Sequence, residues 1–308
     1  MLKMFRRVFN RVSPFIHNIR TISSDIQIIE VGLRDGLQSH KTFIPTDNKK
    51  KLIDKLVLAG ISDIEATAFV SQKAVPQMSD CNEIMNYCNK TYGADNITFS
   101  ALVPNMHFFE KSLYSYSKKV AIFTTVSETF CEKNIRCSIS KSLENYREIC
   151  KKSQKMNIDV RGYVSCIAGC PYEGSVGLNK IIRVCNELLE MGCSEVSIGD
   201  TIGIGNPVQI DVTIAALIFS GIPANKIAVH FHDTNGNALD NIKVALDRGV
   251  TRIDSSINGL GGCPFAPGAP GNVATESVVE MLHDLGCNTG IDTELLEKAR
   301  KYANEITI

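Results

Sequence analysis

Eight short runs of β-branched and apolar residues alternate with segments of helical periodicity, and this alternation limits the fold more than any other feature of the chain. Strands that alternate with helices favour a parallel sheet covered by helices. Eight such units predict a (β/α)8 barrel, or TIM barrel, a fold in which a chain of this length forms one domain. The predicted strands are Ile26–Val31, Ile61–Ala68, Ile97–Val103, Lys119–Val126, Ile158–Val164, Glu195–Ile198, Lys226–Phe231 and Arg252–Ile257.

The segments between these runs carry helix signals. Thr46 and Asp47 have the residue types of a helix cap and precede apolar residues at positions 52, 53, 56 and 57. Apolar residues at positions 278, 281, 282 and 285 have the spacing of one helix face. A doubly wound open sheet is the alternative, but the pattern G-x-G-x-x-G is missing after the first strand. We therefore expect a single TIM-barrel domain over residues 25–308.

Residues 1–24 have the composition of a mitochondrial presequence. This segment contains Lys3 and four arginines, and the first acidic residue of the chain is Asp25. Its apolar residues recur at helical spacing opposite the arginines, as in amphipathic import signals. We expect the segment to direct the protein to the mitochondrial matrix; a basic disordered tail is the alternative.

The charge of the chain argues against nucleic acid as a partner. The full sequence has 33 basic and 33 acidic residues, but residues 1–24 hold five of the basic ones. The remainder therefore has 28 basic and 33 acidic residues, a net charge of about −5. The apolar runs of the N-terminal segment are too short and too charged to span a membrane. We expect no nucleic acid and no membrane as partner, and consider a homodimer possible.

His230 and His232 stand at the end of the seventh predicted strand. Side chains on a strand repeat with period two, so the two imidazoles leave the same face. Neutral imidazole is a common ligand of divalent metal ions. The pair therefore indicates a metal site; two hydrogen-bonded core histidines are the alternative.

Charged residues also end the first two predicted strands. Arg34 and Asp35 follow the first strand, and Glu65 lies inside the apolar second strand. Charges are rarely buried without a partner, and the active site of a TIM barrel lies at the C-terminal ends of its strands. These residues are candidates for catalysis or metal binding, with a structural ion pair as the alternative. Asp200, after the sixth strand, is a weaker candidate that could simply cap a turn.

A loop rich in glycine and proline follows the eighth predicted strand. Eight of the thirteen residues from Gly259 to Gly271 are Gly or Pro, and Cys263 lies among them. Such a loop could cradle a phosphate or move as a lid that positions Cys263. Asn272 follows, where it could cap a helix or turn its amide toward the barrel mouth.

The eleven cysteines form no C-x-x-C pair. Scattered cysteines in odd number are typical of reduced thiols in an intracellular compartment. Cys263 is the strongest candidate for a reactive thiol, because it lies outside the apolar runs. Cys166 and Cys170 are better explained as structural residues.

Taken together, these motifs resemble those of the hydroxymethylglutaryl-CoA (HMG-CoA) lyase family. The resemblance extends from about residue 26 to about residue 290, and Gly-Leu-Gly-Gly-Cys-Pro at 259–264 is its most specific element. The other matching segments are Glu30–Gly32, Arg34–Gln38, Phe69–Ser71, Val75–Met78, Arg161–Cys166, Gly169–Gly174, Gly199–Gly203, His230 and His232–Thr234.

The resemblance implies a metal-dependent lyase that cleaves HMG-CoA to acetyl-CoA and acetoacetate, an activity of ketone-body formation and leucine degradation. It implies a divalent cation, Mg²⁺ or Mn²⁺, as the cofactor and an acyl-CoA as the substrate. The implied metal ligands are Asp35, His230, His232 and Asn272.

The resemblance also implies roles for four further residues. Arg34 would stabilise the enolate left on acetyl-CoA, and Cys263 would transfer a proton from the lid loop. Glu65 would relay a proton or orient its neighbours, and Asn134 would lie near the acyl-CoA.

This chain departs from the usual family pattern at six positions, none of which is an implied ligand: Leu33, Ala68, Phe231, Asn258, Phe265 and Pro267. An isopropylmalate or homocitrate synthase shares the Arg-Asp and His-x-His elements but lacks the cysteine loop. A related aldolase with the same metal geometry is a second alternative, and an inactive barrel that serves as a scaffold is a third.

We predict that residues 1–25, fused to a fluorescent reporter, carry the reporter into mitochondria, because an acid-free amphipathic segment is drawn toward the negative-inside matrix. Fluorescence microscopy tests this prediction. A reporter that remains diffuse in the cytosol would contradict it.

Overall fold

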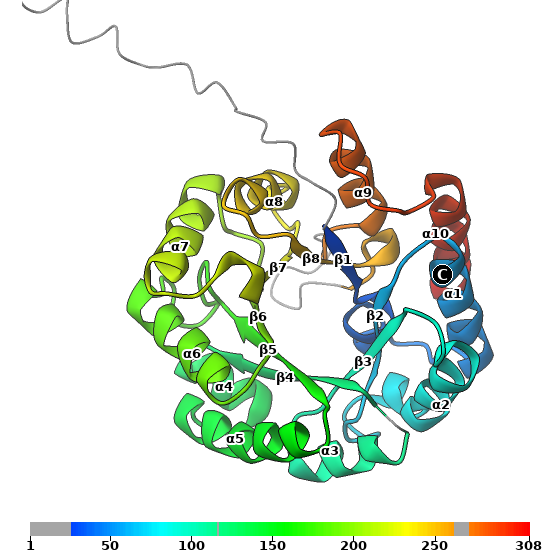
Figure 1. Ribbon diagram of the computed structural model, residues 1–308, viewed down its shortest axis with the longest axis horizontal. Helices are drawn as coiled ribbons and strands as arrows, with labels where there is room; N and C mark the ends of the chain where they lie inside the picture. Colours follow the sequence, from blue (N-terminus) through cyan, green and yellow to red (C-terminus); the bar gives the residue numbers. More distant parts are fainter. Residues whose placement is uncertain (1–25, 116, 262–270) are drawn as a thin grey trace, which may run out of the picture.

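The computed structural model describes residues 26–115, 117–261 and 271–308. Eight parallel strands form a closed barrel in sequence order (Figure 1). All eight predicted strands are present, with ends within two residues of the expected ones, and the TIM-barrel prediction is confirmed. The strands are β1 (Gln27–Glu30), β2 (Asp63–Ala68), β3 (Thr98–Leu102), β4 (Lys119–Thr125), β5 (Asp159–Ser165), β6 (Glu195–Asp200), β7 (Ile227–Phe231) and β8 (Arg252–Ser255).

The helices form a ring around the barrel, and the last helix, α10, lies beside the first, α1 (Figure 1). Two helices follow β4 and two follow β8. The helices are α1 (Thr46–Leu58), α2 (Cys81–Tyr92), α3 (Met106–Leu113), α4 (Glu128–Ile135), α5 (Ile139–Lys155), α6 (Leu178–Glu190), α7 (Pro207–Phe219), α8 (Ala238–Asp247), α9 (Thr275–Asp284) and α10 (Thr293–Thr307).

Two local expectations about helices need correction. The cap residue of α1 is Pro45, and no side chain caps this helix. Thr46 is the first helical residue, and its hydroxyl donates instead to Asp80 on the neighbouring segment, at 3.0 Å. Leu285 lies just beyond the end of α9 and is exposed, because the helix ends at Asp284.

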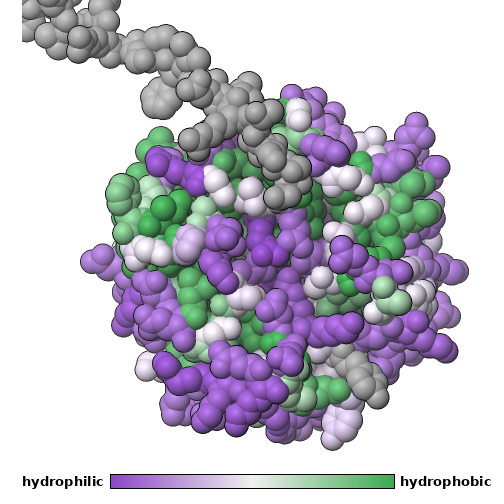
Figure 2. All heavy atoms as spheres, in the orientation of Figure 1, coloured by the Kyte–Doolittle hydropathy of each residue, from purple (hydrophilic) through white to green (hydrophobic). Residues whose placement is uncertain are grey.

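The strands separate apolar and polar residues between the two faces of the barrel wall. On β2, Ile64 belongs to the hydrophobic layer, whereas Asp63 pairs with Lys119 on β4 and Glu65 pairs with Arg34 just after β1. Successive side chains point to opposite faces, so an apolar-polar alternation gives the barrel an apolar outside, under the helices, and a polar inside. In the view along the barrel, hydrophilic residues gather over its centre (Figure 2).

Ion pairs fill much of the barrel interior, where branched apolar side chains are more usual. Glu195 on β6 lies 3.2 Å from Arg161 Nε, 2.8 Å from Arg252 Nε and 3.5 Å from Lys119 Nζ. Lys119 also contacts Asp63, at 2.8 Å. Burial alone would raise the pKa of Glu195, but the three cations lower it below its usual value. The carboxylate therefore stays charged and joins four strands.

None of the described helices is long and apolar enough to cross a membrane.

We predict that Glu195→Gln lowers the free energy of unfolding by about 3–5 kcal/mol, because it leaves the buried cations Arg161 and Lys119 and the partly exposed Arg252 short of a partner. Urea denaturation followed by circular dichroism measures the change. Glu144→Gln is the matched control, since Glu144 pairs with Lys141 on an exposed face of α5 and should leave the midpoint unchanged. Equal midpoints for wild type and Glu195→Gln would contradict the prediction.

Candidate active site

A tight turn directly after β1 places two of the candidate residues at the barrel mouth. Residues Gly32–Gly36 form a short π-helical turn that contains Arg34 and Asp35. The buried carboxylate of Glu30 fixes this turn, because it accepts hydrogen bonds from Gly32 N at 2.7 Å and from Ile257 N at 2.9 Å. A Cβ at position 32 would lie 2.6 Å from that carboxylate, so a larger residue there would displace the Glu30 side chain.

Arg34 is buried among partners from two strands and from its own turn. Its guanidinium donates to Glu65 on β2 and, at 2.5 Å, to the neighbouring Asp35. The guanidinium carbon lies 5.1 Å from the ring centre of Tyr163 on β5. Tyr163 Oη in turn donates to Glu65 at 2.8 Å. Arg34 and Glu65 are thus the ion pair that the sequence left open as an alternative, and Arg34 also contacts Asp35 of the candidate metal site.

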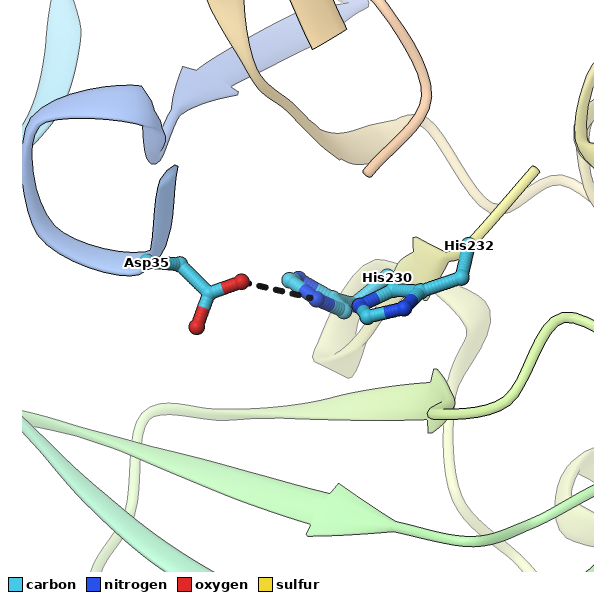
Figure 3. Close-up of side chains that lie close together, drawn as sticks. All are labelled: Asp35, His230 and His232. Carbon is cyan, nitrogen blue, oxygen red and sulfur yellow. Dashed lines mark ion pairs between the residues drawn. The ribbon is translucent and has the colours of Figure 1, made fainter. Parts of the chain in front are cut away.

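His230 and His232 lie together opposite Asp35, as the strand period predicts (Figure 3). The ring centres of the two histidines are 5.5 Å apart, and His230 Nε2 lies 3.8 Å from Asp35 Oδ2. The three residues can each offer one ligand atom, and these atoms lie within 4.8 Å of one another. Asp35 keeps 17% of its side chain exposed, enough for its carboxylate to reach a bound group.

The protonation of this cluster suits a divalent cation. Burial would raise the pKa of Asp35, but Arg34 and His230 hold it well below its usual range. Burial and the neighbouring His230 lower the pKa of His232 to about 4, so this ring is neutral near pH 7. His232 Nδ1 is buried and has no hydrogen-bond partner among the described residues. A charged carboxylate beside a neutral imidazole with an unsatisfied nitrogen fits a metal ion.

Asn272 lies in contact with the same cluster. Its amide nitrogen donates to Asp35 Oδ2 at 2.8 Å and to Leu260 O at 3.1 Å. The residue is buried and pairs with His232 in an isolated β-bridge. Gly261 packs against it so closely that a Cβ there would lie 2.7 Å from the Asn272 amide nitrogen. Gly261, near the start of the glycine-rich loop, and Asn272, directly after it, therefore both lie beside Asp35.

The structure does not place the remaining candidate residues in this cluster. Asn134 is on α4, where its amide donates to Phe130 O at 3.4 Å, and no contact within the described residues links it to Asp35 or Arg34. Cys263 lies outside the described residues. Asp200 caps a turn, since it accepts from Ile204 N at 3.3 Å and Gly205 N at 2.7 Å.

Cys166 and Cys170 are buried thiols, as expected of structural residues. Cys170 Sγ lies 2.9 Å from Ser127 Oγ. Burial raises the pKa of Cys166 to about 12, so this thiol is protonated at neutral pH.

The residues that contact the site and that sequence reasoning assigned no role are Glu30, Arg161, Tyr163 and Asp254. Asp254 contacts His230, and Arg161 contacts Asp254. A signal for them exists, because each is a polar residue inside an apolar strand, such as Asp254 in Arg-Ile-Asp. That pattern predicts on which face of its strand the polar residue lies, but not which residue it contacts across the barrel.

Comparison with known proteins decides the family. Residues 25–302 match the sequence pattern of the protein family described as HMGL-like. The chain belongs to the HMGL-like family. This membership confirms the resemblance found in the sequence.

Relatives in this family are named as lyases. The mitochondrial hydroxymethylglutaryl-CoA lyase of Arabidopsis thaliana is 48% identical over 91% of this chain and 59% of its own length. The mitochondrial enzyme of Gallus gallus is 47% identical over 88% of this chain and 90% of its own. A mouse relative named cytoplasmic is 44% identical over 90% of this chain and 80% of its own. The names are those of HMG-CoA lyases, and the synthase alternative gains no support from them.

Solved structures of the family have the same fold. The HMG-CoA lyase of Brucella melitensis has a TM-score of 0.88 and 43% identity, covering 92% of this chain and 99% of its own. An HMG-CoA lyase from Acinetobacter baumannii, solved with coenzyme A and 3-methylmalate, has a TM-score of 0.85 and 32% identity, covering 92% of this chain and 91% of its own.

We predict that Glu30 makes the stability of the barrel depend on pH. Burial raises the pKa of Glu30 from 4.5 to about 7. The folded state therefore binds this proton more tightly than the unfolded state. The contribution to stability is fully present below about pH 4.5 and is lost as the pH rises through about 7, by roughly 3 kcal/mol.

Urea denaturation of wild type and Glu30→Gln at about pH 5 and about pH 8 tests this dependence. Glutamine keeps a side-chain oxygen for Gly32 N and Ile257 N but does not titrate. The variant should therefore lose less stability than wild type between the two pH values. The same loss in both proteins would contradict the prediction.

Proposed function

We propose that this chain cleaves 3-hydroxy-3-methylglutaryl-CoA to acetyl-CoA and acetoacetate. The observation that carries the proposal is the cluster of Asp35, His230 and His232 beside the buried Arg34, at one end of the barrel of an HMGL-like protein. In this reaction the C3 hydroxyl of the substrate loses its proton and the C2–C3 bond breaks. The products are a ketone and a thioester enolate, which takes up a proton to give acetyl-CoA.

Asp35, His230, His232 and Asn272 would hold a divalent cation, Mg²⁺ or Mn²⁺. One carboxylate, one amide and two imidazoles suit such ions. When bound, the cation supplies Lewis-acid polarisation of substrate oxygen atoms. His232 remains neutral down to mildly acidic pH, so protons would compete with the cation for this ring only under acid conditions.

Arg34 would stabilise the enolate that forms as the bond breaks. A fixed cation in a site shielded from water is most effective where negative charge develops. Burial alone would lower the pKa of Arg34, but Glu65 and Asp35 raise it, so the guanidinium stays charged. Glu65 holds the Nε edge of that guanidinium and also accepts from Tyr163, which favours an orienting role for Glu65.

Cys263 would carry the proton, as its counterpart does in the family that this chain resembles. Asn134 would contact the acyl-CoA from α4, which follows β4 at the active-site end of the barrel. The coenzyme A complex of the Acinetobacter relative supports an acyl-CoA as the substrate class. Substitution of Asn134 by Ala should then raise the KM for the acyl-CoA, and an unchanged KM would remove this residue from the site.

The mitochondrial names of the close relatives support import into mitochondria. Residues 25–308 would then form the single catalytic domain. The matrix is the proposed compartment, and removal of residues 1–24 is tested by N-terminal sequencing of the mature protein. A homodimer is a further possibility that light scattering on the purified protein would decide.

Product analysis tests the activity. Purified protein with Mg²⁺ and HMG-CoA should give acetyl-CoA and acetoacetate in equal amounts, and a chelator should stop the reaction. Acetyl-CoA with a 2-oxo acid should give no condensation product. Absence of acetoacetate, with the protein folded and metal present, would overturn the proposal.

We predict that Arg34→Gln depresses kcat by at least about 10²-fold and leaves metal binding largely intact, because the lost charge acts mainly on the enolate. Arg34→Lys should be a poor substitute, since an ammonium lacks the planar fork that contacts Glu65 and Asp35 together. Steady-state kinetics and Mn²⁺ titration measure both effects. A raised KM with unchanged kcat would mean that Arg34 only binds the substrate.

We predict that an alkylating reagent inactivates the enzyme by modifying Cys263. A substrate analogue with Mg²⁺ should slow this alkylation. A thiol that transfers protons needs a pKa near the working pH, whereas burial raises the pKa of Cys166 to about 12. Peptide mapping identifies the modified residue. Inactivation that follows modification of Cys166 or Cys170 would contradict the proposed role of Cys263.

A further inference from the structure

A carboxylate outside the proposed ligand set holds the ring of His230. Asp254 Oδ2 lies 3.2 Å from His230 Nδ1. The two residues are direct neighbours in the register of β7 and β8, so their side chains enter the barrel side by side. His230 therefore has one carboxylate at each ring nitrogen, Asp254 at Nδ1 and Asp35 at Nε2.

Asp254 is itself fixed by two donors from the adjacent strands β5 and β6. Arg161 Nη2 on β5 donates to Asp254 Oδ1 at 2.5 Å, and Ser197 Oγ on β6 donates to Asp254 Oδ2 at 2.9 Å. The carboxylate is buried, and a buried charge needs partners of this kind. Paired with a guanidinium, Asp254 is an acceptor only.

This arrangement determines which nitrogen of His230 carries a proton. An acceptor at Nδ1 requires that Nδ1 be the donor. In the neutral ring the lone pair then lies on Nε2, the nitrogen that faces Asp35 and the rest of the cluster. Tyr163 packs edge-on against the same ring, with centres 5.8 Å apart, and limits its rotation.

His232 has no such support, since its Nδ1 lacks a hydrogen-bond partner among the described residues. The two imidazoles of the pair are therefore not equivalent. Only His230 is connected, through Asp254 and Arg161, to the ion pairs inside the barrel.

We propose that Asp254 is a positioning residue that fixes the His230 ring and keeps its proton on Nδ1, so that Nε2 can bind the divalent cation. The inference rests on the proposed metal site. Carboxylates behind a ligating histidine commonly raise metal affinity by about 10–100-fold.

Asp254→Asn tests this role, with Ser197→Ala as the matched control. The asparagine removes the charged acceptor of the Nδ1 proton, and Arg161 keeps Glu195 as a partner at 3.2 Å, so the barrel should remain folded. Ser197→Ala removes a hydrogen bond to the same Asp254 oxygen and leaves its contact with His230.

The first measurement is the affinity for Mn²⁺ alone, by electron paramagnetic resonance. Asp254→Asn should bind Mn²⁺ about 10–100-fold more weakly than wild type, whereas Ser197→Ala should stay close to wild type. A folded Asp254→Asn protein with wild-type Mn²⁺ affinity would overturn the inference.

The second measurement is made on the metal-free protein with ¹⁵N-labelled histidine, in which His230 is assigned with a His230→Gln variant. The wild-type spectrum should show a slowly exchanging proton on His230 Nδ1, and Asp254→Asn should lose it. A slowly exchanging proton found only on Nε2 of His230 in the wild-type protein would overturn the inference, even if the Asp254→Asn variant fails to fold.

Failure of the two proposals can be distinguished. A wild-type protein that binds no Mn²⁺ overturns the metal site, and with it the function assigned to Asp254. A wild type that binds Mn²⁺ and an Asp254→Asn variant that binds equally well overturn the inference alone.

Discussion

Arg161 is the side chain on which the rest of the barrel interior depends. Its guanidinium is buried between Glu195, at 3.2 Å, and Asp254, at 2.5 Å. An unpaired charge in this position would be very costly, so the guanidinium needs a carboxylate partner and has two. Through this contact the ion pairs between strands β4, β6 and β8 are joined to His230 at the site.

The candidate site is held together by the same kind of buried ion pair. Arg34 lies between Glu65 and Asp35, and Glu65 also accepts from Tyr163. Every one of these side chains comes from a strand or from the turn directly after a strand. Catalytic groups held by short strand ends keep their geometry better than groups on long loops, and a reaction through an enolate needs a cation that does not move.

The site combines a fixed part with a part attached to a loop. Asp35, His230 and His232 belong to the fixed part. Asn272 and Gly261 stand at the two sides of the glycine-rich loop and contact the fixed part directly.

The sequence by itself determined the barrel, because eight apolar runs separated by amphipathic helices leave few other ways to bury the strands. It also placed His230 and His232 on one face, since the strand period is local. The Thr46 cap was wrong, because Asp80 from another segment takes its hydroxyl. Only the tertiary structure decided that Arg34 pairs with Glu65 and that Asp254 faces His230. The partners in these two contacts are 31 and 24 positions apart in the sequence, and no local pattern specifies which polar side chains meet across a closed barrel.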